Sequence, residues 1–137
     1  MENKEKQNQE IYMEFQALEQ HIKQLQGQLE MVTQQLMELS VTNNSLDELN
    51  SIKTGKEIFV PISSGIFAKA NISSTTELLV NVGANVVVQK DVPSTKKLIL
   101  QQIEEIKKVQ MQFMNELDKM TSRASELEME LQKLVGK

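Results

Sequence analysis

The stretch EIFVPISSGIFAKANISSTTELLVNVGANVVVQK, residues 57–90, decides the fold of this 137-residue chain. It is rich in β-branched residues, and apolar and polar residues alternate along much of it, which is typical of β-strands. Short turns lie between successive runs, and this spacing predicts two β-hairpins. We expect strands at residues 57–62, 65–72, 77–82 and 85–90, with turns at Ser63–Ser64 and Gly83–Ala84.

Two apolar ladders flank this insert, one on each side. Their residues recur at alternating spacings of three and four, which is the 3.5-residue period of a coiled-coil seam. The ladders have the same length, since one runs from Ile11 to Leu46 and the other from Ile99 to Leu134. An antiparallel pair of equal helices therefore leaves no overhang. We expect helices at residues 7–54 and 92–135, and one domain over residues 1–137.

Several residues bear on where the helices end or bend. Gly55 is expected to stop the first helix, and Pro93 suits the first turn of the second. Residues 40–45 are rich in poor helix formers, and Ser45 with Glu48 has the spacing of a capping box, so a kink or local break is considered there. The seam contains two polar a positions, Asn43 and Gln110, which help to fix the register.

The insert is expected to assemble with other subunits. A two-stranded ribbon is marginal in water, because it exposes backbone groups along both edges and has no second layer for its apolar face. Hairpins from several copies or related subunits can pair into a closed β-barrel. The alternative is a small sheet that packs on its own helices. The residues assigned to oligomerisation are Ile58, Val60, Ile62, Ile66, Ala68, Leu78, Val80, Val82, Val86 and Val88.

Composition narrows the remaining classes of protein. Only five aromatic residues are present, which disfavours a large globular core, and cysteine is absent, which excludes disulfides and thiolate metal sites. No apolar run is long enough to span a bilayer, and the first ten residues do not resemble a signal peptide. The net charge of −4 disfavours nucleic acid as a partner. We therefore expect a cytoplasmic protein that binds neither membrane nor nucleic acid.

The sequence contains only weak candidates for a catalytic or ligand-binding site. The one histidine, His21, falls at a solvated g position of the heptads. The string from Lys53 to Lys56 lacks the first glycine and the final hydroxyl residue of a phosphate-binding loop. Glutamates of the second helix have lysines nearby, which indicates solvated charge pairs. We expect no enzyme, no catalytic residue, no metal site and no cofactor.

The whole pattern resembles the archaeal prefoldin alpha subunit. The resemblance covers residues 7–135 and is carried most specifically by the two hairpins, EIFVPISSGIFAKA (57–70) and ELLVNVGANVVV (77–88), between two sets of heptads. It implies an α+β fold in which a long antiparallel coiled coil carries two central β-hairpins that form an intersubunit β-barrel. It also implies two alpha subunits with four beta subunits, and an ATP-independent holdase that passes unfolded clients to a group II chaperonin.

For a chaperone of this shape, the working surface is expected at the tip of the coiled coil, where the helix ends meet. Some apolar residues there occupy e or f positions, which are normally polar, and flexible methionines suit many clients. The alternative for the seam residues is that they simply finish the coiled coil. The predicted client-binding residues are Ile11, Tyr12, Met13, Phe15, Met129, Leu131, Leu134 and Val135.

Two other functions stay open at this stage. One is a structural scaffold whose coiled coil tethers partners through fixed contacts. The other is a prefoldin-like subunit within a transcription or remodelling assembly. The apolar e and f residues favour the chaperone, because a scaffold would ordinarily carry charged tips or a defined binding motif.

Overall fold

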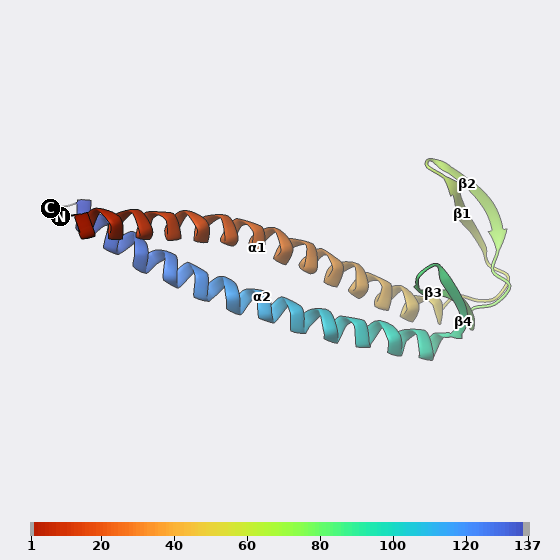
Figure 1. Ribbon diagram of the computed structural model, residues 1–137. Helices are drawn as coiled ribbons and strands as arrows, with labels where there is room; N and C mark the ends of the chain where they lie inside the picture. The colour runs from red at the N-terminus through yellow and green to blue at the C-terminus, as the bar shows by residue number, and fades with distance from the viewer. Residues whose placement is uncertain (1, 136–137) are drawn as a thin grey trace. The chain divides into compact units, whose positions relative to one another are not determined.

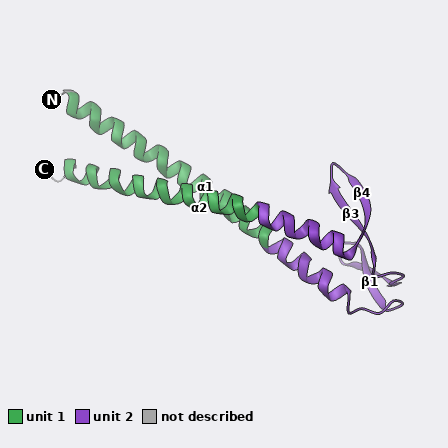
Figure 2. Cartoon of the chain, turned by 90° about the horizontal axis from the view of Figure 1, so that it is seen from below, with its two compact units in different colours: residues 1–36, 106–137 green, residues 37–105 purple. Residues whose placement is uncertain are grey.

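The computed structural model describes residues 2–135, with side chains from residue 3 to residue 134. In chain order the elements are α1 (Glu2–Leu49), β1 (Glu57–Ser63), β2 (Ile66–Asn71), β3 (Glu77–Gly83), β4 (Val86–Asp91) and α2 (Val92–Val135) (Figure 1). The chain divides into two compact units (Figure 2). Unit 1 contains residues 1–36 and 106–137, and unit 2 contains residues 37–105. The predicted α+β fold of two long helices and two hairpins is confirmed.

The predicted seam is the buried stripe of both helices. In α1, partly or fully buried side chains recur from Ile11 to Leu46 with the expected spacings of three and four. In α2, the same pattern runs from Ile99 to Leu131. Within unit 1, Leu25 and Leu127 are the buried hydrophobic residues, and Leu127 is fully enclosed. The period of 3.5 residues thus places one apolar stripe on each helix against the other.

The limits of α1 differ from the prediction of residues 7–54. The helix begins at Glu2, because the residues after it, Lys4 to Gln7, are good helix formers. It ends at Leu49, where the Ser51 N–H and hydroxyl both bond to the carbonyl of Glu48, at 3.0 and 2.6 Å. These bonds close a turn that takes the chain out of the helix.

The kink or local break considered at residues 40–45 does not occur in α1. Thr42 and Ser45 donate their hydroxyls to the carbonyls of Glu38 and Val41, four residues earlier, at 2.9 Å each. The predicted capping box at Ser45 is wrong, because its hydroxyl is directed backward along the helix and not toward a free N–H. The helix continues without interruption to Leu49.

Gly55 belongs to the base of the first hairpin and does not terminate the helix. Its φ is +91°, and its N–H donates to the carbonyl of Ile72 at 2.7 Å. The Ile72 N–H in turn donates to the carbonyl of Lys56 at 3.1 Å. These two bonds tie the entry of the hairpin to its exit.

Both hairpins are antiparallel, two-stranded sheets. Val60 lies opposite Ala68 in one, and Val80 opposite Val88 in the other. Each turn lies one residue later than predicted, at residues 64–65 and 84–85. Gly65, Ala84 and Asn85 have the positive φ that hairpin turns favour. Gly83 also has a positive φ, yet it pairs with Val86 as the last residue of β3.

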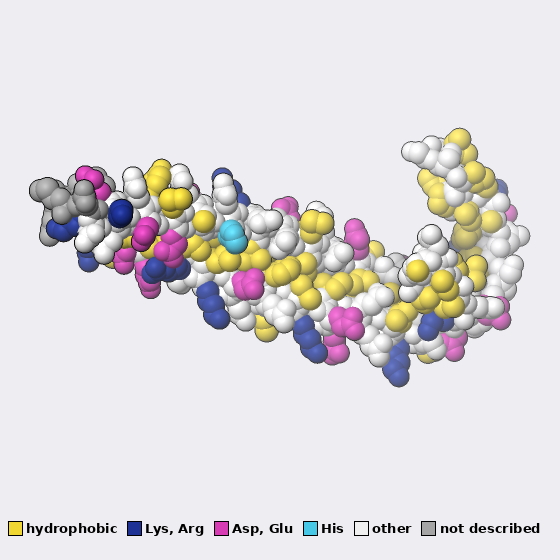
Figure 3. Space-filling model, viewed as in Figure 1, with side chains coloured by type: hydrophobic (Ala, Val, Ile, Leu, Met, Phe, Trp, Pro, Cys, Tyr) yellow, Lys and Arg dark blue, Asp and Glu magenta, His cyan; other side chains and the backbone are white. Residues whose placement is uncertain are grey.

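The core of unit 2 is small. Leu46 of α1 packs with Val92 and Ile99 of α2, and the partly buried residues around them are Leu39, Leu49, Leu78 and Ile103. Leu78 comes from β3, so the base of the second hairpin packs on helices of its own chain, as the alternative expected. Lys96 and Asp47 form an ion pair between the helices of this unit. Figure 3 shows hydrophobic side chains along the helices and over the hairpins.

Candidate client-binding end of unit 1

The first turns of α1 and the last turns of α2 lie side by side in unit 1. Seam residues Ile11, Phe15 and Leu131 are partly buried there. Leu134, in the final turn of α2, is 43% exposed, more than the seam residues that precede it. The seam therefore becomes accessible at this end.

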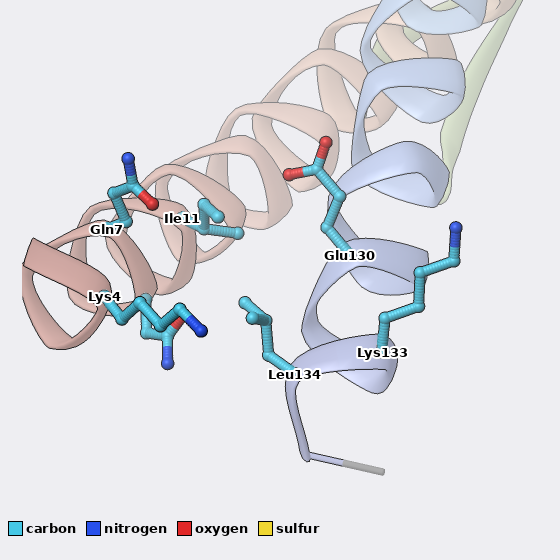
Figure 4. Close-up of a pocket in the computed structure, with 7 residues that line it drawn as sticks. Lys4, Gln7, Ile11, Glu130, Lys133 and Leu134 are labelled. Carbon is cyan, nitrogen blue, oxygen red and sulfur yellow. The ribbon is translucent and has the colours of Figure 1, made fainter. Parts of the chain in front are cut away.

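A groove of about 300 Å³, the end groove, lies between the two helix ends (Figure 4). Figure 4 shows Ile11 of α1 and Leu134 of α2 pointing toward each other, with Lys4 beside them. Glu130 and Lys133 line the α2 side. The end groove thus has an apolar floor and charged walls.

A second groove of about 630 Å³, the amide groove, lies beside it. Tyr12 and Met13 of α1 and Leu131 of α2 form its apolar lining. The Gln16 amide donates to the Tyr12 hydroxyl at 3.1 Å, so the phenol at the edge of the groove has a fixed partner. The complete described lining is Asn8, Gln9, Tyr12, Met13, Gln16 and Leu131.

Five of the predicted client-binding residues line the two grooves: Ile11 and Leu134 the end groove, and Tyr12, Met13 and Leu131 the amide groove. Phe15 and Met129 line neither of them. Tyr12, Met13 and Met129, which the heptad count directed away from the seam, are between 53% and 68% exposed. Val135 is the last residue of α2, and its side chain lies outside the described ones. That these residues bind clients stays a prediction.

An ionic network holds the two helices together near this end. The Arg123 Nε lies 3.1 Å from Oε1 of Glu14 across the helix pair, and its Nη1 lies 3.3 Å from Oε2 of Glu126. The hydrogen bonds to Glu14, and then those to Glu126, raise the pKa of the Arg123 guanidinium. Because these groups are half exposed, the network mainly orients the side chains and contributes little to stability.

The residues assigned to oligomerisation lie on the two hairpins as expected, but their environments differ. Ile58, Ala68, Val80 and Val88 are partly buried, as is Leu78 on the helix core. The remaining members are exposed: Val60, Ile62, Ile66, Val82 and Val86. Exposed valine and isoleucine side chains on an isolated two-stranded sheet are typical of a surface that another subunit covers.

The sequence interpretation missed a second apolar face on each hairpin. Phe59 and Phe67, on β1 and β2, and Leu79 and Val87, on β3 and β4, are between 55% and 78% exposed. They occupy the alternate positions, opposite the predicted oligomerisation face. The unbroken apolar runs in EIFVPI and NVVVQK could have revealed it, because a strand buried on both faces lacks alternation.

Other kinds of site find little support among the residues that the structure describes. That part of the chain contains no group of three or more His, Cys, Asp or Glu side chains placed to hold a metal ion. None of its helices contains an apolar stretch long enough to cross a membrane.

Comparisons with known proteins agree with this architecture. Prefoldin alpha subunits resemble the chain over most of its length. The one from Thermofilum pendens is 29% identical, over 84% of this chain and 89% of its own. The one from Methanobrevibacter smithii is 30% identical, over 93% and 81%. The fold matches a chain in the cryo-EM structure of filamentous PFD from Methanocaldococcus jannaschii, with a TM-score of 0.75, 16% identity, and coverage of 84% of this chain and 95% of that one.

The family assignment rests on a match to nearly the whole chain. The model of the prefoldin subunit family matches residues 18–137, which include most of α1, both hairpins and all of α2. The two hairpins and the flanking heptads that carried the resemblance in sequence lie within that match. The chain belongs to the prefoldin family of chaperone subunits.

Proposed function

We propose that this chain is an ATP-independent holdase subunit that captures unfolded polypeptides at the helix ends of unit 1. The observation that carries the proposal is the exposure of Tyr12 and Met13, which line the amide groove, together with that of Met129 in the last turns of α2. Surface apolar residues that occur singly are common, but a cluster beside a groove favours binding. Flexible methionines suit clients of many shapes.

The hairpins supply the assembly that such a binding site needs. One end groove buries little of a client, so binding by a single chain is weak. Several coiled coils that engage one client raise the apparent affinity through effective concentration. The exposed apolar residues of both hairpins support assembly with prefoldin beta subunits, and we propose a complex of two alpha with four beta subunits.

Weak contacts of this kind also allow release without nucleotide hydrolysis. We propose that the held polypeptide passes to a group II chaperonin, which completes folding. The family assignment and the similarity to alpha subunits support this step. Client contact by the helix ends does not depend on it and is tested separately.

The test is suppression of aggregation of an unfolded client by the assembled complex, without nucleotide. Replacing Tyr12, Met13 and Met129 together by serine removes exposed apolar area at the helix ends. Burial of each such side chain contributes roughly 1.5–3 kcal/mol before entropy losses, so we expect the variant to lose most of its holdase activity. Its mass by light scattering should equal that of the wild type, because no hairpin residue is changed.

A matched control is available in the same helices. Met31, Met37 and Met111 are 65–67% exposed and lie away from the helix ends, so their replacement by serine should leave holdase activity unchanged. Equal loss in both triple variants would indicate nonspecific hydrophobic contact along the coiled coil. An assembled complex that ignores unfolded clients even with the wild-type helix ends would favour a scaffold.

A further inference from the structure

The amide groove has an unusual lining for an apolar binding site. Its described residues are three apolar or aromatic side chains and three carboxamides, those of Asn8, Gln9 and Gln16, and none carries a charge. The neighbouring end groove shares Asn8 but is also walled by the charged side chains of Lys4, Glu130 and Lys133. The two grooves therefore offer different chemistry to a client.

The carboxamides stand in register along α1. Asn8, Tyr12 and Gln16 follow one another at intervals of four residues, so they form one stripe of the helix surface. Gln9 and Met13 form the adjacent stripe by the same spacing. Polar and apolar groups thus alternate along the wall at the spacing of one helical turn, about 5.4 Å.

A carboxamide presents both a donor and an acceptor, which are the two groups that a peptide bond presents. It can therefore bond to the main chain of any unfolded polypeptide, whatever its sequence. A folded protein has its main-chain groups already paired, whereas an unfolded one leaves them free. Main-chain recognition consequently selects the unfolded state.

The charges around the groove restrict which segments are accepted. Residues 3–18 and 120–134 carry six carboxylates and four cationic groups, so the described helix ends have a net negative charge. A segment flanked by Asp or Glu is repelled by this field, and one flanked by neutral or basic residues is not. Charge complementarity therefore favours the latter.

We propose that the amide groove holds one bulky apolar side chain of an unfolded segment between Tyr12, Met13 and Leu131, while Asn8, Gln9 and Gln16 bond to the peptide groups that flank it. The proposal rests on client capture by the helix ends and specifies what is captured: an extended, non-acidic segment with its main-chain donors free. The Gln16–Tyr12 hydrogen bond fixes the aromatic wall before the segment arrives.

The test uses the full-length chain in its assembled complex and a labelled, unstructured Gly/Ser peptide with one central leucine, followed by fluorescence anisotropy. Replacing Asn8 by leucine and Gln9 by methionine keeps the approximate size of both side chains but removes their hydrogen bonds. If the groove were only apolar, this N8L/Q9M variant would bind as tightly as the wild type or more tightly. We expect it to bind about fivefold to thirtyfold more weakly, since it loses one or two neutral hydrogen bonds and each contributes about 1 kcal/mol.

A second peptide tests the same hydrogen bonds by changing the peptide groups of the client. N-methylation of the peptide groups next to the leucine removes their donors, so it should weaken binding to the wild type and change binding to N8L/Q9M little. Gln24→Met is the control substitution, because Gln24 is exposed on α1 outside the grooves. It should leave both affinities unchanged.

A third peptide tests the effect of charge. With glutamates beside the leucine, it should bind the wild type more weakly than a peptide with lysines there.

The outcomes separate this inference from the proposed function. If Tyr12→Ser with Met13→Ser abolishes peptide binding while N8L/Q9M leaves it intact, the helix ends bind clients but the amides do not recognise the main chain. If neither pair of substitutions changes binding, or the wild type binds no peptide, client capture at this end is also wrong. Weakening by N8L/Q9M together with the N-methyl effect supports main-chain recognition.

Discussion

At the scale of single residues, the two polar positions of the seam behave differently. The Gln110 amide donates to the Thr33 hydroxyl of the other helix at 3.2 Å. The Oδ1 of Asn43 is buried, and none of the described residues donates a hydrogen bond to it. A buried acceptor without a partner reduces stability, whereas a bonded one reduces it little. The seam layer at Asn43 is therefore less stable than the layer at Gln110.

We expect Asn43→Leu to stabilise the protein by about 1–3 kcal/mol, the cost of an unsatisfied buried polar group. The added apolar side chain lies in the seam near Leu46, one helical turn away. Thermal unfolding followed by circular dichroism, at one fixed protein concentration, measures the change. Asn44→Leu is the control, because Asn44 is exposed and next in sequence. A smaller rise in Tm for Asn43→Leu than for Asn44→Leu would contradict this explanation.

Asp91 caps the N-terminus of α2. Its Oδ1 accepts from the Ser94 N–H at 2.8 Å, and its carbonyl accepts from the Thr95 hydroxyl at 2.8 Å. Hydrogen bonding by the Ser94 side chain, then by its backbone, and the charge of Lys90 hold the pKa of the Asp91 carboxyl below its ordinary value. A lowered pKa in the folded state means that the ionised carboxylate stabilises the fold.

The pH dependence follows from the direction of this shift. The contribution of Asp91 is complete above the ordinary Asp pKa, near 3.8, and is lost as the pH falls through the lower folded-state value. We expect Asp91→Ala to lower Tm at pH 7, and the difference from wild type to shrink below pH 4. Asp91→Asn should lower Tm less at pH 7, because asparagine is also a good N-cap. A constant difference from pH 7 to pH 2 would show that ionisation of Asp91 does not stabilise the helix.

At the scale of elements, the hairpins are the least self-sufficient parts of the chain. Val80 and Val88 lie directly opposite each other on β3 and β4 and are partly buried. The reverse face of the same hairpin exposes Leu79 and Val87. A two-stranded sheet that is apolar on both faces requires covering from both sides.

Replacing Val80 and Val88 by lysine should therefore lower the mass of the complex toward that of isolated subunits. Lysine at both positions places two like charges opposite each other on a face that the partner must cover. Light scattering after size-exclusion chromatography gives the mass, and circular dichroism monitors the helices. Gln101→Lys with Gln112→Lys is the control, because both glutamines are exposed on α2, outside the hairpins, and the pair adds the same charge. A complex of unchanged mass in the double variant would exclude this face from assembly.

The sequence predicts the elements well and their ends less well. The seam is correctly predicted because the heptad period determines which side chains are buried, independently of where the helix ends. The ends of α1 depend on hydrogen bonds, such as those from Ser51 to Glu48, that follow no apolar pattern. The second turn is predicted at Gly83–Ala84 because glycine favours a positive φ, but Gly83, with a φ of +113°, is the last residue of β3, and the turn is Ala84–Asn85.

The candidate site was predictable only in part. Heptad counting identified Tyr12, Met13 and Met129 as outward-facing apolar residues at the helix ends. It did not identify the carboxamides of the amide groove, because glutamine and asparagine at outer heptad positions are ordinary solvent-facing residues. Their significance depends on which of them share a groove with Leu131 of the other helix, and that is a tertiary relationship.

At the scale of the whole molecule, the sites proposed for capture and for assembly lie in different segments. The exposed apolar cluster of the helix ends belongs to unit 1, and both hairpins belong to unit 2. Substitutions at one can therefore be examined without changing residues of the other. A loss of holdase activity without a loss of mass, and the reverse, are both expected among suitable variants.

Client capture by the helix ends is tested most directly by site-specific photo-crosslinking in the assembled complex. A photoreactive phenylalanine analogue is placed at position 12 or 129, at the helix ends of unit 1, or at position 31 or 111, where the native methionines are similarly exposed. An unfolded client is added, and the cross-linked product is quantified. We predict strong cross-linking from positions 12 and 129 and little from positions 31 and 111. Equal cross-linking from all four positions, or none from positions 12 and 129, would contradict capture at the helix ends.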